Sequence, residues 1–216
     1  MEPSIKKKLE SFFSHHEYKH YKKGEIVIDA DSFPSGIFYL SKGTVKQYSL
    51  SSDGVEQILT IYKPSSFFPM MWAVNDTKVC HYFEALSEVE IWKAPKDVVI
   101  TFIKNEPEIL YDLLSRLYRG MDGLLSRIEY FMTGSAYHKV IFTILNTAYR
   151  FGEKIDTSNS VILYTTHKEI AAFSGLTKET ISRESRKLQK RGLIENKNHQ
   201  IRIKNMLELE EELLIN

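Results

Sequence analysis

The chain has 216 residues, of which 43% are apolar and 12% aromatic, enough to fill the cores of one or two globular domains. Its apolar runs stop short of the roughly 18 to 20 residues that span a bilayer, and the N-terminus has neither the apolar segment nor the cleavage site of a signal peptide. Because the single cysteine, Cys80, excludes a disulfide framework, we expect a soluble protein of the reducing cytoplasm.

The formal net charge of +1 is divided unevenly along the chain. Residues 1–134 hold 16 bases and 18 acids, whereas residues 135–206 hold 13 bases and 6 acids. This asymmetry points toward nucleic acid as a partner of the C-terminal part, although a basic face that is simply solvated would give the same counts.

The first part of the chain reads as short strands separated by turns. Ser52-Asp53-Gly54 is a typical turn, and the segments around it are rich in β-branched and aromatic residues. Several brief strands at close spacing predict an antiparallel, jelly-roll-like β roll for residues 1–105. The expected strand segments are GEIVIDA at 24–30, GIFYLSKGTVKQYSL at 36–50, VEQILTIY at 55–62 and YFEALSEVEIWK at 82–93.

The apolar spacing changes to that of a helix between Glu106 and Met132. Apolar residues recur there at intervals of 4, 3, 4, 3, 4 and 3, the heptad pattern of a helix that packs along a second helix. Gly120 and Gly123 each weaken an isolated helix by about 1 kcal/mol, and the same face could pack on the chain's own β domain. We predict a dimerisation helix at residues 106–134 and a homodimer whose seam is formed by Leu110, Leu114, Leu117, Met121, Leu124, Ile128 and Phe131.

Residues 135–216 are predicted to form a second, smaller domain. A helix is expected from His138 to Arg150 and a strand at residues 161–165. Thr166 and Glu169 then have the spacing of a capping box, in which each side chain accepts a hydrogen bond from a free backbone donor at a helix start. The next helix therefore begins at about residue 167.

A further helix follows closely. The chain breaks at Ser174-Gly175 and restarts with Thr177 as N-cap, and the new helix runs to Arg191, where Gly192 supplies a left-handed stop. Two helices joined by a short turn that contains glycine form a helix-turn-helix. The second helix carries a basic excess, which suits phosphate contacts beside base contacts.

The segments LIEN and QIRIKN, joined by a turn at Lys197-Asn198, are expected to form a hairpin wing after these helices. The predicted fold class is therefore α+β, with a β roll, a long helix and a winged helix-turn-helix.

This domain order, together with GLTKETISRESRKLQKRGLI at residues 175–194, resembles the Crp/Fnr family of bacterial transcription regulators. Glu179, Ser182 and Arg183 match the Glu-x-x-Ser-Arg arrangement of the Fnr branch. Glu184 departs from the family pattern, because an apolar residue usually packs inward at its position. Such a glutamate either loosens the motif's core or turns its carboxylate outward.

The resemblance implies a homodimer that binds an inverted repeat of TTGAT-like half-sites in double-stranded DNA and contacts RNA polymerase. From their chemistry, we predict that Glu179, Ser182 and Arg183 read bases, since a guanidinium can bind guanine O6 and N7 and a carboxylate can accept from cytosine N4. The predicted contacts to the DNA backbone are Thr166, His167, Thr177, Lys178, Thr180, Arg186, Lys187, Lys190 and Arg191.

Family members that bind cyclic nucleotides carry Gly-Glu followed by Arg-Ser, because a cyclic phosphate needs a cation and backbone donors. Here Pro69-Met70 and Val79-Cys80 stand near those positions, and no arginine precedes Arg116. We therefore expect no cyclic AMP clamp. The aromatic and methionine residues of this stretch either close the core of the roll, the interpretation we favour, or line an apolar effector pocket made of Phe68, Met70, Met71, Trp72, Cys80 and Tyr82.

No cofactor or metal is expected. One cysteine cannot hold an iron-sulfur cluster, and haem bound through Cys80 or His81 stays open only as a chemical option. We interpret the cluster His15, His16 and His20 as part of a surface helix rather than as a metal site.

Two other classes of function stay open at this point. A cupin-like enzyme would also use a small β barrel, but His81 is the only histidine between residues 21 and 137, and no catalytic constellation has a convincing spacing. A protein-binding scaffold with an accessory DNA-binding domain would explain the heptad helix. It would not explain the basic helix at residues 178–191.

Overall fold

The structure is a computed structural model that describes residues 2–155, 159–197 and 200–214. It contains two compact units, residues 1–119 and 120–216, which meet within the long helix α4, Pro107–Thr133. The first part of α4 thus belongs to the first unit and the rest to the second. The domain limits 1–105, 106–134 and 135–216 stay a prediction.

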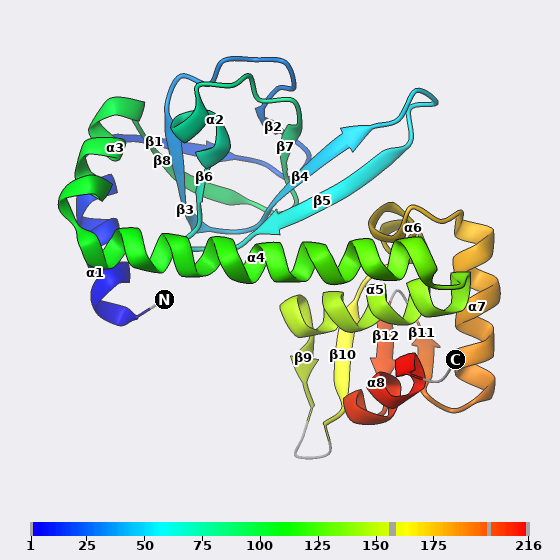
Figure 1. Ribbon diagram of the computed structural model, residues 1–216. Helices are drawn as coiled ribbons and strands as arrows, with labels where there is room; N and C mark the ends of the chain where they lie inside the picture. The colour runs from blue at the N-terminus through cyan, green and yellow to red at the C-terminus, as the bar shows by residue number, and fades with distance from the viewer. Residues whose placement is uncertain (1, 156–158, 198–199, 215–216) are drawn as a thin grey trace. The chain divides into compact units, whose positions relative to one another are not determined.

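The first unit is an antiparallel β roll of two sheets (Figure 1). One sheet has the order β1-β8-β3-β6 and the other the order β2-β7-β4-β5, and β4 and β5 project from the roll as a long hairpin. The strands are β1 (Glu17–Tyr21), β2 (Ile26–Ile28), β3 (Ile37–Lys42), β4 (Val45–Leu50), β5 (Glu56–Tyr62), β6 (Phe67–Phe68), β7 (Tyr82–Ala85) and β8 (Val89–Ala94).

An aromatic stack joins the two sheets through the core of the roll. Phe68 on β6 lies 6.1 Å from Phe38 and 5.2 Å from Phe83, measured between ring centroids, and Phe83 belongs to the opposite sheet. Tyr62 of β5 packs on the same two rings, Phe68 and Phe83. Because large rings fill the space between the sheets, the interior of the roll is largely occupied by its own side chains.

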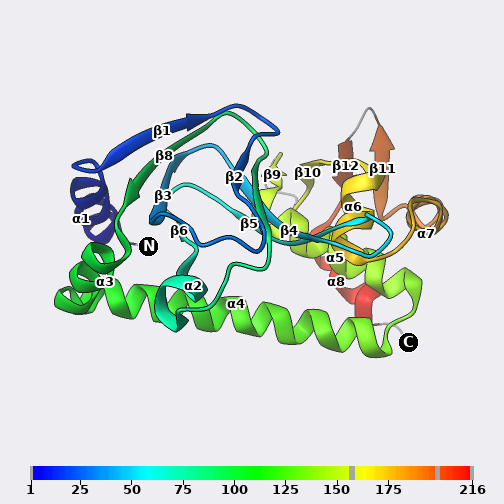
Figure 2. The same ribbon diagram turned by 90° about the horizontal axis from the view of Figure 1, so that it is seen from above.

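Three helices accompany the roll: α1 (Pro3–Phe13), α2 (Met70–Asn75) and α3 (Lys96–Asn105). Helices α1 and α3 lie together at one end of it (Figures 1 and 2), where the rings of Phe12 and Phe102 stack at 3.9 Å. The interpretation of His15, His16 and His20 as part of a surface helix is wrong. His20 lies on β1, opposite Glu90 of β8, because Tyr18 and Tyr21 favour an extended strand.

The second unit contains a sheet of order β11-β12-β10-β9 and the remaining helices. Helix α5 packs on α6, α7 and α8. The elements are α5 (Ala136–Phe151), β9 (Glu153–Lys154), β10 (Val161–Tyr164), α6 (His167–Ser174), α7 (Lys178–Lys190), β11 (Ile194–Lys197), β12 (Gln200–Ile203) and α8 (Met206–Leu214). The predicted wing is the β11–β12 hairpin, although Asn198 of its predicted turn lies outside the described residues.

The predicted fold class is confirmed: a β roll, a long helix and a winged helix-turn-helix follow one another along the chain. None of the helices within the described residues is long and apolar enough to cross a membrane.

Candidate nucleic-acid interface

The helix pair α6–α7 is built by the local signals that the sequence carries. Glu169 accepts from the backbone N–H of Thr166 at 2.7 Å, and the Thr166 hydroxyl accepts from the backbone N–H of Glu169 at 3.2 Å, which completes the capping box. Gly175 ends α6 at φ 64°, a conformation that glycine adopts without strain. Thr177 caps α7 by accepting from the backbone N–H of Thr180 at 3.2 Å.

Helix α7 has one buried face and one exposed face. Ile181 and Leu188 are fully buried against the core of the unit. The exposed face brings the predicted base-reading residues together, because Glu179 and Arg183 lie one turn apart and Ser182 lies half-buried beside them. The other exposed side chains of α7 are cations: Lys178, Arg186, Lys187 and Lys190.

Glu184 does not turn its carboxylate outward. It is buried, with 2% of its surface exposed. Its carboxylate accepts from Arg183 Nε at 2.8 Å through one oxygen and lies 2.6 Å from Lys187 Nζ through the other. Burial acts to raise the pKa of this carboxyl, but the hydrogen bonds from Lys187 and Arg183 outweigh it and hold the pKa below its ordinary value.

His167, the first residue of α6, connects that helix with the wing. Its Nε2 lies 3.2 Å from Asn196 Nδ2 on β11. Burial, and then the positive charges of Lys178 and Arg186, lower the pKa of His167. An imidazole beside two cations and an amide is a suitable environment for an anion such as a DNA phosphate.

Arg191, another predicted phosphate contact, is engaged within the unit. Its Nη2 lies 2.6 Å from a carboxylate oxygen of Glu212 on α8, whose other oxygen accepts from the Tyr137 hydroxyl at 2.8 Å. Burial and this hydrogen bond raise the pKa of Tyr137 to about 12. In this structure Arg191 thus ties the end of α7 to α8, and its role at DNA stays a prediction.

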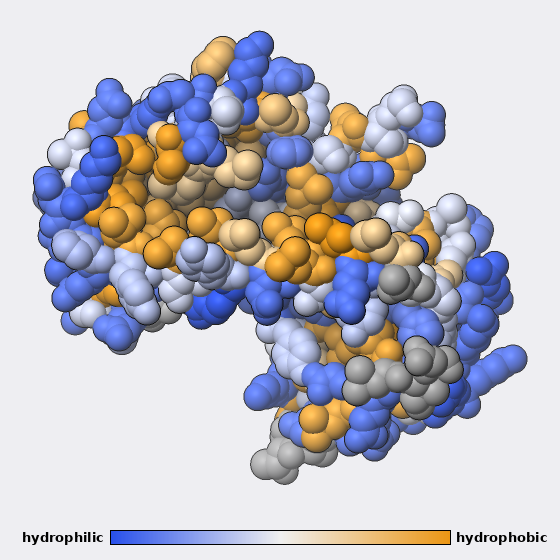
Figure 3. Space-filling view, viewed as in Figure 1, coloured by the Kyte–Doolittle hydropathy of each residue, from blue (hydrophilic) through white to orange (hydrophobic). Residues whose placement is uncertain are grey.

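The predicted dimer seam follows an exposed face of α4. Leu117, Leu124 and Ile128 are 57%, 52% and 53% exposed, although they are large and apolar. Apolar side chains form a band along α4 in Figure 3. Leu110, Leu114 and Met121 are exposed as well, while Phe131 is half-buried under the guanidinium of Arg127.

The residues predicted to line an effector pocket do not share one lining. Phe68 and Trp72 belong to the core of the roll, with Met70 packed against it. Met71 is 73% exposed, and Cys80 is exposed too. Successive strand residues point to opposite faces, so Tyr82 stacks on Tyr48 while its neighbour Phe83 faces the interior of the roll.

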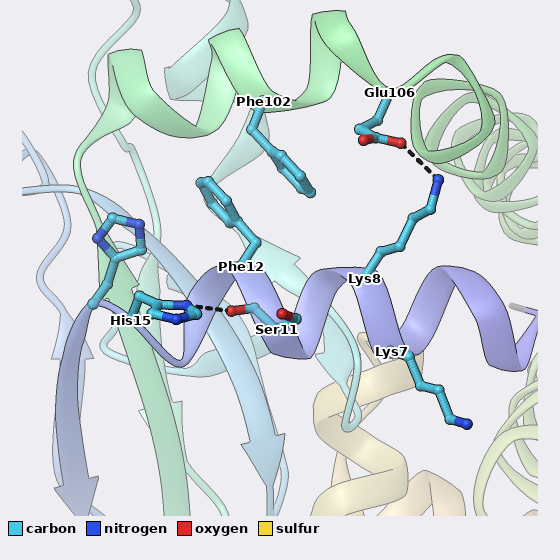
Figure 4. A pocket seen from close by; sticks show the side chains of 8 residues that line it. Lys7, Lys8, Ser11, Phe12, His15, Phe102 and Glu106 are labelled. Carbon is cyan, nitrogen blue, oxygen red and sulfur yellow. Dashed lines mark hydrogen bonds and ion pairs between the residues drawn. The ribbon is translucent and has the colours of Figure 1, made fainter.

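A shallow hollow lies instead between α1 and α3 (Figure 4), lined by Lys7, Lys8, Ser11, Phe12, His15, His16, Phe102 and Glu106. Lys8 pairs there with Glu106 at 2.8 Å, and His15 Nδ1 lies 2.6 Å from the carbonyl oxygen of Ser11. Lys8 and His15 are therefore already paired with groups of the protein. In the part of the chain that the structure describes, no group of three His, Cys, Asp or Glu side chains is arranged to hold a metal ion.

Sequence reasoning missed two residues, Asn196 and Arg127, and the pairing of a third, Glu184. Asn196 carries no motif, and only its place on the wing brings it to His167. Glu184 was singled out, but its pairing with Lys187 could have been found from their spacing of three residues on a helix. Arg127 donates to the carbonyl oxygen of Phe173 near the end of α6, a contact between segments far apart in the sequence that no local pattern predicts.

Comparison with known proteins agrees with this architecture. The profile "Cyclic nucleotide-binding domain" matches residues 18–106, and the profile "Crp-like helix-turn-helix domain" matches residues 138–212. Regulatory protein HlyX of Actinobacillus pleuropneumoniae is 26% identical over 191 residues, which are 88% of this chain and 79% of that protein. The cAMP-activated global transcriptional regulator CRP of Pasteurella multocida is 26% identical over 193 residues, 89% of this chain and 92% of that protein.

Among solved structures, a CRP/FNR-family transcriptional regulator from Thermus thermophilus superposes with a TM-score of 0.75 at 21% identity, covering 92% of this chain and 99% of that one. This likeness supports the fold. With the two profiles in this order on a β roll, a long helix and a winged helix-turn-helix, the chain belongs to the Crp/Fnr family of transcription regulators, which bind DNA and are not enzymes.

Proposed function

We propose that this chain is a homodimeric regulator that binds an inverted-repeat DNA site with two copies of α7 and does not respond to cyclic AMP. The observation that carries the proposal is the exposed face of α7, where Glu179 and Arg183 stand one turn apart among cations. A helix of this composition at the surface of a winged-helix unit suits the major groove of DNA.

The proposed base contacts follow from the donors and acceptors of this face. The guanidinium of Arg183 can bind guanine O6 and N7 with two parallel hydrogen bonds, and Glu179 can accept from a cytosine N4 amino group. Lys190 and the cluster of His167, Lys178 and Arg186 neutralise phosphates on either side. Resemblance to the Fnr branch suggests half-sites like TTGAT.

The inverted repeat follows from a two-fold dimer. A seam of exposed apolar residues on α4 supports such a dimer, which would set the two α7 helices about 34 Å apart, one turn of DNA. Contact with RNA polymerase is part of the same proposal and rests on the family resemblance alone.

A binding selection from random duplexes, analysed with two single variants, tests the base assignment. Arg183→Ala should cost about 1 to 3 kcal/mol on the selected site and relax the preference at one guanine in each half-site, because it removes a base contact. Lys190→Ala is the matched control on the same helix. It should weaken binding to all sequences alike and lower the salt dependence of log K by about 0.9, as expected for one lost phosphate contact. Enrichment of no inverted repeat, or an unchanged preference in Arg183→Ala, contradicts the proposal.

A further inference from the structure

Glu184 is the part of α7 that the proposed base contacts leave unexplained. Its carboxylate lies on the buried face, yet its partners are Arg183 and Lys187, whose own side chains are 65% and 56% exposed. A buried carboxylate needs hydrogen-bonding partners to offset its lost hydration. Arg183 is the proposed guanine contact, and Lys187 is one of the residues predicted from the sequence to contact the DNA backbone.

We propose that Glu184 is a positioning residue that determines specificity: it fixes Arg183 for guanine and restrains Lys187 from binding phosphate indiscriminately. The inference rests on the proposed function of α7. Arg183 uses Nε to donate to Glu184 Oε1 at 2.8 Å, which leaves its two terminal nitrogens for a base edge. Both terminal nitrogens can then donate in parallel to O6 and N7.

The hydrogen bond to Glu184 restrains the Arg183 guanidinium before DNA binds. This favours the guanine contact, because a long side chain loses rotamer freedom when it binds. Arginine has about 2 kcal/mol of such entropy, and a residue that is already restrained loses less of it at the base. A guanine contact that must be assembled from a freely moving side chain discriminates less well, since the same side chain also reaches nearby phosphates.

Glu184 has the opposite effect on Lys187, because it hinders a DNA contact there instead of favouring one. Its Nζ lies 2.6 Å from Glu184 Oε2, so a phosphate must compete with a buried carboxylate for this ammonium. The competition lowers the affinity for every sequence, random DNA included, because phosphate contacts do not depend on sequence. Glu184 therefore raises the discrimination for guanine through Arg183, and through Lys187 it weakens the binding of DNA of any sequence.

The test compares Glu184→Leu with Glu184→Gln in the full-length protein, measured on the selected duplex, on a duplex changed at the guanine opposite Arg183, and on random DNA. Leucine restores the apolar residue usual in the family and should keep the fold, because a buried ion pair can be replaced by an apolar group with little loss of stability. Glu184→Leu should lose about fivefold to tenfold of the guanine discrimination. It should also bind random DNA several-fold more tightly, with a salt slope about 0.9 steeper.

The Glu184→Gln variant separates the positioning of Arg183 from the negative charge of residue 184. Its side-chain oxygen can still accept from Arg183 Nε, but it carries no charge to hold Lys187. Glu184→Gln should therefore keep the guanine discrimination within about twofold of the wild type, and its salt slope should change as in Glu184→Leu. Equal loss of discrimination in both variants would show that charge alone acts, and it would overturn the positioning role.

A double-mutant cycle shows whether the effect passes through Arg183. In an Arg183→Ala background, Glu184→Leu should cause no further loss of guanine discrimination, because the side chain it positions is gone. If Glu184→Leu keeps its guanine discrimination while Arg183 is native, the inference about Glu184 is wrong, and the proposed function is unaffected. If Arg183→Ala alone does not relax the preference for guanine, the result contradicts the proposed function itself, and not only the role of Glu184. Glu184→Met replaces the leucine variant if circular dichroism shows that the latter does not fold.

Discussion

The imidazole of His167 lies where α6, α7 and the wing meet. Because burial and two cations lower the pKa of His167 from 6.5, the folded protein takes up a proton there less readily than the unfolded chain. This histidine stabilises the fold above about pH 6.5, and its contribution is lost as pH falls through the lowered pKa of the folded state. A phosphate at the same place has the opposite effect, since a negative charge raises the pKa of the imidazole.

DNA affinity should therefore rise as pH falls from about 8 to about 6, while the unfolding midpoint of the free protein falls. Fluorescence anisotropy and thermal unfolding on the same samples measure both trends. His167→Gln should weaken both pH dependences. An affinity that does not change with pH in the wild type would show that His167 does not meet a phosphate.

At the same scale, the sequence predicts the helix face on which a residue lies better than it predicts the residue's hydrogen-bonding partner. The spacing of Glu179 and Arg183 on one face is correctly read from a period of 3.6 residues. The inward position of Glu184 is also readable, because it follows the buried Ile181 by three residues. The partners His167 and Asn196 are 29 residues apart along the chain, and only tertiary packing selects such a pair.

Between elements, Arg127 joins α4 to the end of α6. Its guanidinium donates to the carbonyl oxygen of Phe173, the residue before the last of α6. Carbonyls at a helix C-terminus lack partners in their own helix and carry partial negative charge, so a cation there stabilises the helix.

Arg127→Met should lower the free energy of unfolding of the second unit by about 1 to 2 kcal/mol and speed amide hydrogen exchange in α6. Arg119→Met is the control, because that exposed arginine donates to the carbonyl oxygen of Ser115 within α4 itself. Exchange measured by mass spectrometry in residues 167–174 distinguishes them. Equal rates in the two variants would mean that the Arg127 contact adds nothing.

Element prediction succeeded where local chemistry is strong and failed where it is weak. The capping box, the cap Thr177 and the stop at Gly192 gave the bounds of α6 and α7 closely. Helix α1 was missed although Ile5, Leu9 and Phe13 recur at a helical spacing, so a signal was present. Strand β1 is mostly polar and exposed, and α2 is only 6 residues long; neither displays a period that sequence alone can detect.

On the scale of the whole molecule, the seam on α4 predicts the oligomeric state. Leu124→Glu should convert the protein to a monomer at micromolar concentration, because burying an unpaired carboxylate in an apolar interface costs several kcal/mol. Sedimentation velocity measures the change, with Asp122→Ala as an exposed control outside the seam on the same helix. A monomeric wild type, or a dimeric Leu124→Glu protein, would contradict the seam.

A second prediction at this scale concerns cyclic AMP and the β roll. Calorimetric titration with cyclic AMP at up to about millimolar concentration should detect no saturable binding, because the first arginine of the chain is Arg116 and a cyclic phosphate lacks its usual cation. The domain profile and the relative activated by cAMP make this a sharp test. Saturable binding would show that lysine or backbone donors replace the arginine.

The exposed seam would also make the occupancy of a DNA site depend on the concentration of the protein in the cell. Only a dimer can present two copies of α7 to an inverted repeat, and below its dissociation constant the dimer's concentration varies as the square of the protomer concentration. Occupancy of a target site would then climb steeply once synthesis outpaces dilution, and fall as steeply when synthesis stops. In the proposed dimer, an apolar stripe on one helix would in this way turn gene dosage into a threshold.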